Sequence, residues 1–174
     1  MGLLGIKFKV ADSGYVEITH KHLSHEQLVK FLALGKSRAA AKKYPSAVII
    51  AADTMVSFRG RIIGKPQNKS EAINMLKSFS GKSQDVVSGT VVLDAESGKA
   101  LATASKIKIY FKKLSNREIL AYVNSGEPYD KAGSYNLQGT GFNLIDKIQG
   151  NISDGLGMSI EFVFNALQKL KVKI

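Results

Sequence analysis

The sequence contains no cysteine, no tryptophan and only three prolines. Without cysteine the chain has no disulfide, no thiolate nucleophile and no cysteine-ligated zinc site. It also lacks any apolar run close to the roughly 18 residues that a membrane-spanning helix needs, and its first residues lack the apolar core of a signal peptide. These absences exclude thiol catalysis and disulfide-stabilised secreted domains, and we expect a cytoplasmic protein.

Acidic residues are also scarce: 14 of them face 25 lysines and arginines, which gives a formal net charge of +11. Such an excess favours a partner that carries phosphate, whether nucleotide, nucleic acid or anionic lipid. The lysines are scattered from Lys7 to Lys173 instead of forming one basic segment, and a lysine-rich solvated surface explains the charge equally well. The scatter makes nucleic acid the less favoured partner.

Apolar periodicity predicts an α/β chain with a mixed, twisted sheet flanked by helices, in a single domain over residues 1–174. Capping-box spacing places a helix start at Ser24, with Gln27, and another at Ser115; Ser70 is expected to cap the helix between them. The expected helices cover residues 24–44, 70–78, 115–126 and 159–170. The expected strands cover residues 6–18, 47–52, 86–93, 101–111 and 144–148.

Asp53 follows the apolar run of residues 47–52, so we expect it at the carboxyl end of a buried strand. Ligand sites in open α/β sheets gather at such ends, and a carboxylate there can bind a divalent cation or act as a base toward water. Lys65 precedes Pro66, which restricts its backbone to extended conformations and suits it to present a charge to phosphate. The alternatives are a turn-capping aspartate and a surface lysine in a turn.

The stretch Tyr129 to Gly141 is polar, rich in glycine and long for a loop without regular structure. Asp130, Lys131 and Gln138 within it can supply directional contacts to a ligand, whereas the alternative is an ordered surface loop. From their patterns alone, Glu17 on the early strand and Lys36 on the first helix suit solvated positions. The histidines of "THKHLSH", His20, His22 and His25, also read as solvated, and we expect no metal site there.

The chemistry-bearing stretches, taken together, resemble the Maf family of nucleoside triphosphate pyrophosphatases. Five motifs occur in family order along nearly the whole chain. They are "ADT" at Ala52–Thr54, "GKP" at Gly64–Pro66, "SFSGKSQDVVSG" at Ser78–Gly89, "ILAYVNSGEPYDKAGSYNLQG" at Ile119–Gly139 and "IQGNISDGLG" at Ile148–Gly157. The long segment that contains "DKAG" is the most specific of these.

The resemblance implies an α/β fold with two lobes around a cleft, often assembled as a homodimer. It also implies hydrolysis of a nucleoside triphosphate between the α and β phosphates, with Mg²⁺ or Mn²⁺. The implied roles are catalytic for Asp53, Lys36 and Lys65, metal-binding for Glu17 and Asp53, and substrate-binding for Gln138, Asp130 and Lys131. The glutamine in "YNLQG" is more similar to the branch that uses dTTP and UTP than to the branch that uses 7-methyl-GTP.

Three features depart from the family pattern. A first strand with an "SSxR"-like phosphate loop is expected ahead of the segment "LLGIKF", and here Met1 stands almost directly at that segment. The histidine of the family's "GxxHxV" stretch is Gln84, and the proline of its late "GLP" is Gly157. These departures leave open a second interpretation, a nucleotide- or nucleic-acid-binding protein that keeps the site without turnover. A purely structural role accounts for none of the motifs.

Overall fold

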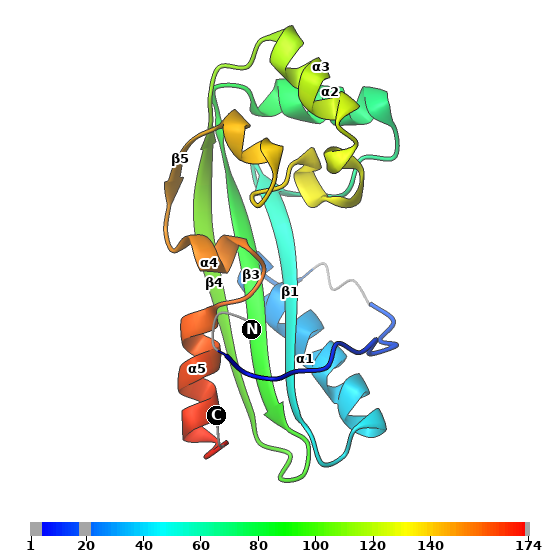
Figure 1. Ribbon diagram of the computed structural model, residues 1–174, viewed down its shortest axis with the longest axis vertical. Coiled ribbons are helices and arrows are strands. Elements are labelled where there is room, and N and C mark those ends of the chain that lie inside the picture. Colours follow the sequence, from blue (N-terminus) through cyan, green and yellow to red (C-terminus); the bar gives the residue numbers. More distant parts are fainter. Residues whose placement is uncertain (1–4, 18–21, 173–174) are drawn as a thin grey trace. The chain divides into compact units, whose positions relative to one another are not determined.

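The computed structural model describes residues 5–17 and 22–172 (Figure 1). Five strands form one sheet in the order β2-β1-β3-β4-β5, with β2 antiparallel to β1 and β5 antiparallel to β4. The strands are β1 (Val48–Phe58), β2 (Arg61–Ile63), β3 (Ser83–Asp94), β4 (Ala100–Phe111) and β5 (Ile145–Gln149). The α-helices are α1 (His25–Lys43), α2 (Lys69–Phe79), α3 (Asn116–Asn124), α4 (Ile152–Gly155) and α5 (Ile160–Lys169). This architecture confirms the α/β class.

Two compact units share the long strands β1, β3 and β4. We call residues 1–54, 88–105 and 157–174 the first unit, and residues 55–87 and 106–156 the second unit. Each has its own buried apolar core. The single domain and the cleft between lobes therefore stay predictions, and each unit is described by itself.

In the first unit, helix α1 packs directly on strand β3 at Gly89. A Cβ atom at this glycine would lie 2.4 Å from the carbonyl oxygen of Val29, so no larger residue fits without a backbone shift. Helix α5 buries Val163 and Leu167 against Val92 of the same strand. The side chain of Ser24 accepts the amide of Gln27, which confirms the capping box predicted for α1.

In the second unit, α2 and α3 contact each other and bury one apolar face each around Phe79. The ring of Phe79 lies 5.0 Å from that of Phe58 and 5.5 Å from that of Phe111. The loop between α3 and β5 contains three short 3₁₀ segments, η2 (Glu127–Asp130), η3 (Ala132–Ser134) and η4 (Thr140–Leu144). This loop is thus ordered and packed against the helices, although it has no long element.

Some predicted elements are wrong. Residues 6–17 form no strand, and within this segment the backbone amide of Gly14 donates to the side chain of Asp12. Strand β1 does not end at Ala52 but continues to Phe58, so Asp53 lies inside the strand. Helix α2 is capped by Asn68, whose side chain accepts the amide of Glu71, and not by Ser70. Among the described residues, no helix is long and apolar enough to cross a membrane.

Candidate active site

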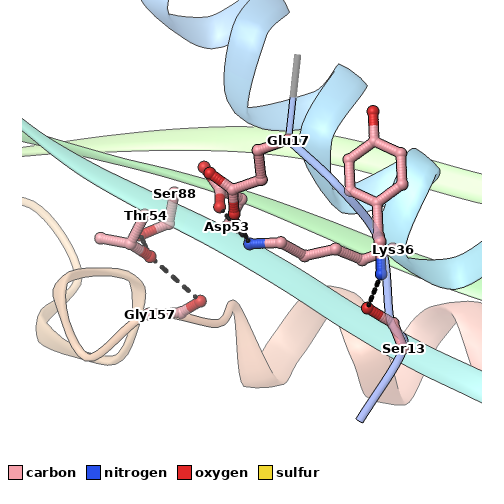
Figure 2. Close-up of polar contacts among 8 residues, drawn as sticks. Ser13, Glu17, Lys36, Asp53, Thr54, Ser88 and Gly157 are labelled. Atoms are coloured by element: carbon pink, nitrogen blue, oxygen red, sulfur yellow. Dashed lines mark hydrogen bonds and ion pairs between the residues drawn. The ribbon is translucent and has the colours of Figure 1, made fainter. Parts of the chain in front are cut away.

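Lys36 joins two carboxylates in the first unit. Its Nζ lies 2.5 Å from Oδ1 of Asp53 and 2.8 Å from Oε1 of Glu17 (Figure 2). The Asp53 side chain is 11% exposed, that of Lys36 25% and that of Glu17 55%. The structure therefore brings together three residues that are far apart in the sequence, and Glu17 is the one most accessible to solvent.

Three different elements position these side chains. Lys36 comes from α1, Asp53 from the middle of β1, and Glu17 from the irregular segment of residues 5–17 instead of the strand predicted for it. That segment is shaped by a turn in which the amide of Tyr15 donates to the hydroxyl of Ser13. The clustering is thus tertiary and has no signature in local sequence spacing.

The electrostatics of the cluster follow from its geometry. Burial by itself would lower the pKa of Lys36, but the hydrogen bonds that its ammonium donates to Asp53 and Glu17, and their negative charges, raise it above the ordinary value of 10.5. Lys36 is therefore charged at neutral pH. Two of its three N–H groups have carboxylate acceptors, and within the described part of the chain the third has none.

Thr54 follows Asp53 and joins a second polar group of the same unit. Its hydroxyl shares a 2.9 Å hydrogen bond with Ser88 of β3 and donates to the carbonyl oxygen of Gly157 at 3.4 Å. Gly157 has φ +107°, which proline cannot adopt because its ring holds φ near −65°. The glycine that replaces the family's proline is thus required by this backbone conformation.

In the second unit, "GKP" and "DKAG" are held together by their backbones. The amide of Gly133 donates to the carbonyl oxygen of Gly64 at 3.0 Å, next to Lys65. Lys131 Nζ lies 2.7 Å from Oδ2 of Asp130. The hydrogen bond from Lys131 lowers the pKa of Asp130, and the charge of Lys65 acts in the same direction. One predicted lysine therefore pairs with the predicted aspartate, and the charge of a second also acts on it.

Gln138 is exposed, and its backbone amide donates to Oδ1 of Asn136 at 3.0 Å. Gln84, in contrast, is only 2% exposed and lies in the interior of the second unit. His22 and His25 belong to no group of three or more potential metal ligands in the described residues, and His20 lies outside those residues. Sequence reasoning missed Glu127, whose carboxylate binds Thr140 two residues after Gln138.

A cavity of about 710 Å³ lies in the first unit and reaches Lys36, but neither Asp53 nor Glu17 lines it. Its walls are mostly apolar and include Ile50 of β1, Leu167 of α5 and Met158, which precedes α5. Three lysines, Lys7, Lys9 and Lys36, also line it.

The donor set at Lys36 suits a divalent cation in part. Carboxylate oxygens are the ligands that Mg²⁺ prefers, and Mg²⁺ often takes only one or two of them, with phosphate oxygens and water completing its shell. Glu17 and Asp53 already converge on one positive charge. Among the described residues, no histidine and no further carboxylate completes a group of three ligands with them. The pair therefore fits a cation that is also bound by substrate.

Comparison with known proteins agrees with the motif order. The family model described as "Maf-like protein" matches residues 1–170. A protein named dTTP/UTP pyrophosphatase from Methanosarcina mazei is 36% identical over 99% of this chain and 87% of its own. Proteins of the same name from Methanococcoides burtonii and Aquifex aeolicus are 37% and 35% identical over 99% of this chain, which spans 88% and 89% of their lengths. The chain belongs to the Maf family.

Proposed function

We propose that this chain is a nucleoside triphosphate pyrophosphatase that hydrolyses dTTP and UTP. Water attacks the α phosphorus, the bond from that phosphorus to the bridging oxygen breaks, and the products are the nucleoside monophosphate and pyrophosphate. The relatives' names support the reaction class. The observation that carries the proposal is the ammonium of Lys36 held between Asp53 and Glu17.

Asp53 is the proposed base. The Asp53 carboxylate is largely shielded from solvent and is held by Lys36. A water molecule that hydrogen-bonds to this carboxylate is oriented by it and can give it a proton as the water attacks. Lys36 is the proposed electrophilic partner. Its remaining N–H can bind an oxygen of the α phosphate and stabilise the negative charge that develops there.

Glu17 and Asp53 are the residues that would hold the divalent cation. Such an ion, when bound, neutralises phosphate charge and acts as a Lewis acid. Glu17 is the more exposed of the two carboxylates, so it can turn from Lys36 toward an incoming cation at lower cost. Lys36 keeps its bond to Asp53 in that arrangement.

The residues of the second unit have proposed roles in binding. Lys65 and Lys131 would neutralise phosphate charge, and Asp130 would hold Lys131 in place through their 2.7 Å ion pair. Gln138 would contact the nucleobase, because its amide offers both a donor and an acceptor and its side chain is exposed. Assembly as a homodimer and a cytoplasmic location stay predictions.

Product analysis tests the proposal. The chain is incubated in ¹⁸O-labelled water with dTTP, UTP, dCTP, ATP or GTP, with Mg²⁺ or Mn²⁺, and the products are identified by mass spectrometry. The proposal expects dTMP and UMP that carry the label, and unlabelled pyrophosphate. Label in pyrophosphate, or release of orthophosphate and a diphosphate, would contradict attack at the α phosphorus. Saturable nucleotide binding without turnover would support the non-catalytic alternative.

A further inference from the structure

We propose that Glu127 is a positioning residue for substrate choice, because it fixes the loop that presents Gln138. We call residues 136–140 the Gln138 loop. The inference rests on the proposed function, in which Gln138 contacts the nucleobase. Glu127 is not among the site residues predicted from the sequence, and the relatives' names assign it no role.

The first anchor of the Gln138 loop is Tyr122 of α3. Its hydroxyl oxygen accepts the amide of Asn136 at 3.0 Å, and the side chain of Asn136 in turn accepts the amide of Gln138. Tyr122 is only 5% exposed, and burial raises its pKa to about 12. The hydroxyl therefore stays neutral, and the loop is tied to the core of the second unit just before Gln138.

The second anchor is the carboxylate of Glu127. Its Oε1 accepts both the amide of Thr140, at 3.1 Å, and the hydroxyl of Thr140, at 2.8 Å. Its Oε2 lies against Gly139 so closely that a Cβ there would be 2.4 Å away. These contacts from Thr140 lower the pKa of Glu127, so the carboxylate is charged at neutral pH. The loop is thus tied down just after Gln138 as well.

Gln138 therefore lies between two fixed points, each two residues away. The backbone of the loop and the side chains of Asn136 and Thr140 make the anchoring bonds, whereas Gln138 is exposed for a ligand. A glutamine whose backbone is held in this way has less backbone entropy to lose when it binds a base. Loss of Glu127 should affect the choice between bases more than it affects the chemical step.

Glu118 provides a matched control for Glu127. Its Oε2 also accepts an amide and a hydroxyl from one residue, Ser115, at 2.8 and 2.6 Å, but it does so at the start of α3. Both glutamates are in the second unit, and removal of either breaks two hydrogen bonds of the same kind. Only Glu127 contacts the Gln138 loop, so a general loss of stability and a loss of positioning can be told apart.

The test measures kcat and KM for dTTP and dCTP in the wild type and in Glu127→Ala, Glu127→Gln and Glu118→Ala. For Glu127→Ala we expect the ratio of kcat/KM for dTTP to that for dCTP to fall about tenfold, mainly through KM for dTTP. In Glu127→Gln the ratio should fall less, because the side-chain oxygen of glutamine can still accept hydrogen bonds from Thr140. Glu118→Ala should keep the ratio. An unchanged ratio in folded Glu127→Ala, or an equal loss in Glu118→Ala, would overturn the proposal.

Two further measurements separate this inference from the proposed function. In Glu127→Ala combined with Gln138→Ala, the ratio should fall no further than in Gln138→Ala alone, since the glutamate acts through the glutamine. Additive losses would overturn the positioning role. Amide hydrogen exchange at Thr140 needs no substrate: we expect faster exchange in Glu127→Ala, and unchanged exchange would contradict the anchor even if the wild type releases no pyrophosphate.

Discussion

The ammonium of Lys36 lies 2.5 Å from the carboxylate of Asp53, which links α1 to β1 across 17 positions of the sequence. Because Glu17 binds the same ammonium, one cation holds two acids that would otherwise repel each other. The proposed base is thus held in place before substrate arrives.

Replacement of Lys36 by methionine should make the protein more responsive to metal. The two carboxylates would lose their shared cation and repel each other, and a divalent ion is the natural replacement. We expect about 5 mM Mg²⁺, a concentration high enough to fill a weak site, to raise the melting temperature of Lys36→Met more than that of the wild type. Glu17→Gln added to Lys36→Met should reduce the rise, and an equal rise in all three proteins would contradict a cation site at this pair.

The contribution of Lys36 to stability should vary with pH only in the alkaline range. Its pKa is raised in the folded state, so its contribution is complete below the ordinary value of 10.5 and is lost as pH rises through the raised value. The difference in free energy of unfolding between the wild type and Lys36→Met should therefore be level from pH 7 to about 10 and shrink above it. Urea unfolding at each pH measures this, and a difference that shrinks below pH 9 would be inconsistent with the ion pairs.

Replacement of Gly35 by alanine should disturb the site without unfolding the helix. A Cβ at Gly35 would lie 2.3 Å from the ring of Tyr15, so the ring and the segment that carries Glu17 must move. Alanine also favours the helix by about 1 kcal/mol relative to glycine. We expect pyrophosphate release to fall about tenfold with no loss of melting temperature. Arg38→Ala, at an exposed position of the same helix, is the control and should keep full activity.

Replacement of Gly89 by alanine should have the opposite pattern. The added Cβ would meet the backbone of α1 at Val29, which cannot rotate away as a side chain can. Overpacking of this kind destabilises by about 3 kcal/mol. The urea midpoint should therefore fall clearly, and a midpoint equal to that of the wild type would show that α1 and β3 are less closely packed than described.

Local signals predicted the helices well and the strands less well. The capping boxes of Ser24 and Ser115 are complete within four residues, so the sequence alone located the starts of α1 and α3. A strand forms only by pairing with another segment, and the local sequence does not indicate which segment that is. Residues 6–17 alternate in polarity but pair with no strand, and β1 extends past Asp53 because Met55 and Val56 are buried in the second unit.

The site shows the same limit. Asp53, Lys65 and the long glycine-rich loop stood out from their own neighbourhoods, whereas Lys36 and Glu17 read as solvated residues and were identified only through the family resemblance. Their importance lies in a contact between residues far apart in the chain. Glu127 was missed for a related reason, since its partner Thr140 is 13 positions away; an acid between Gly126 and Pro128 in an ordered loop was the available signal.

Pyrophosphate release from dTTP by the wild type and by Asp53→Asn is the most direct test of Asp53 as the catalytic base. The substitution keeps the shape of the side chain and removes its charge, and nucleotide binding can be measured in parallel as a check on folding. The account predicts turnover in the wild type and a loss of at least about a hundredfold in Asp53→Asn, with binding retained. Equal turnover in both proteins would contradict the claim that Asp53, held by Lys36, is the catalytic base.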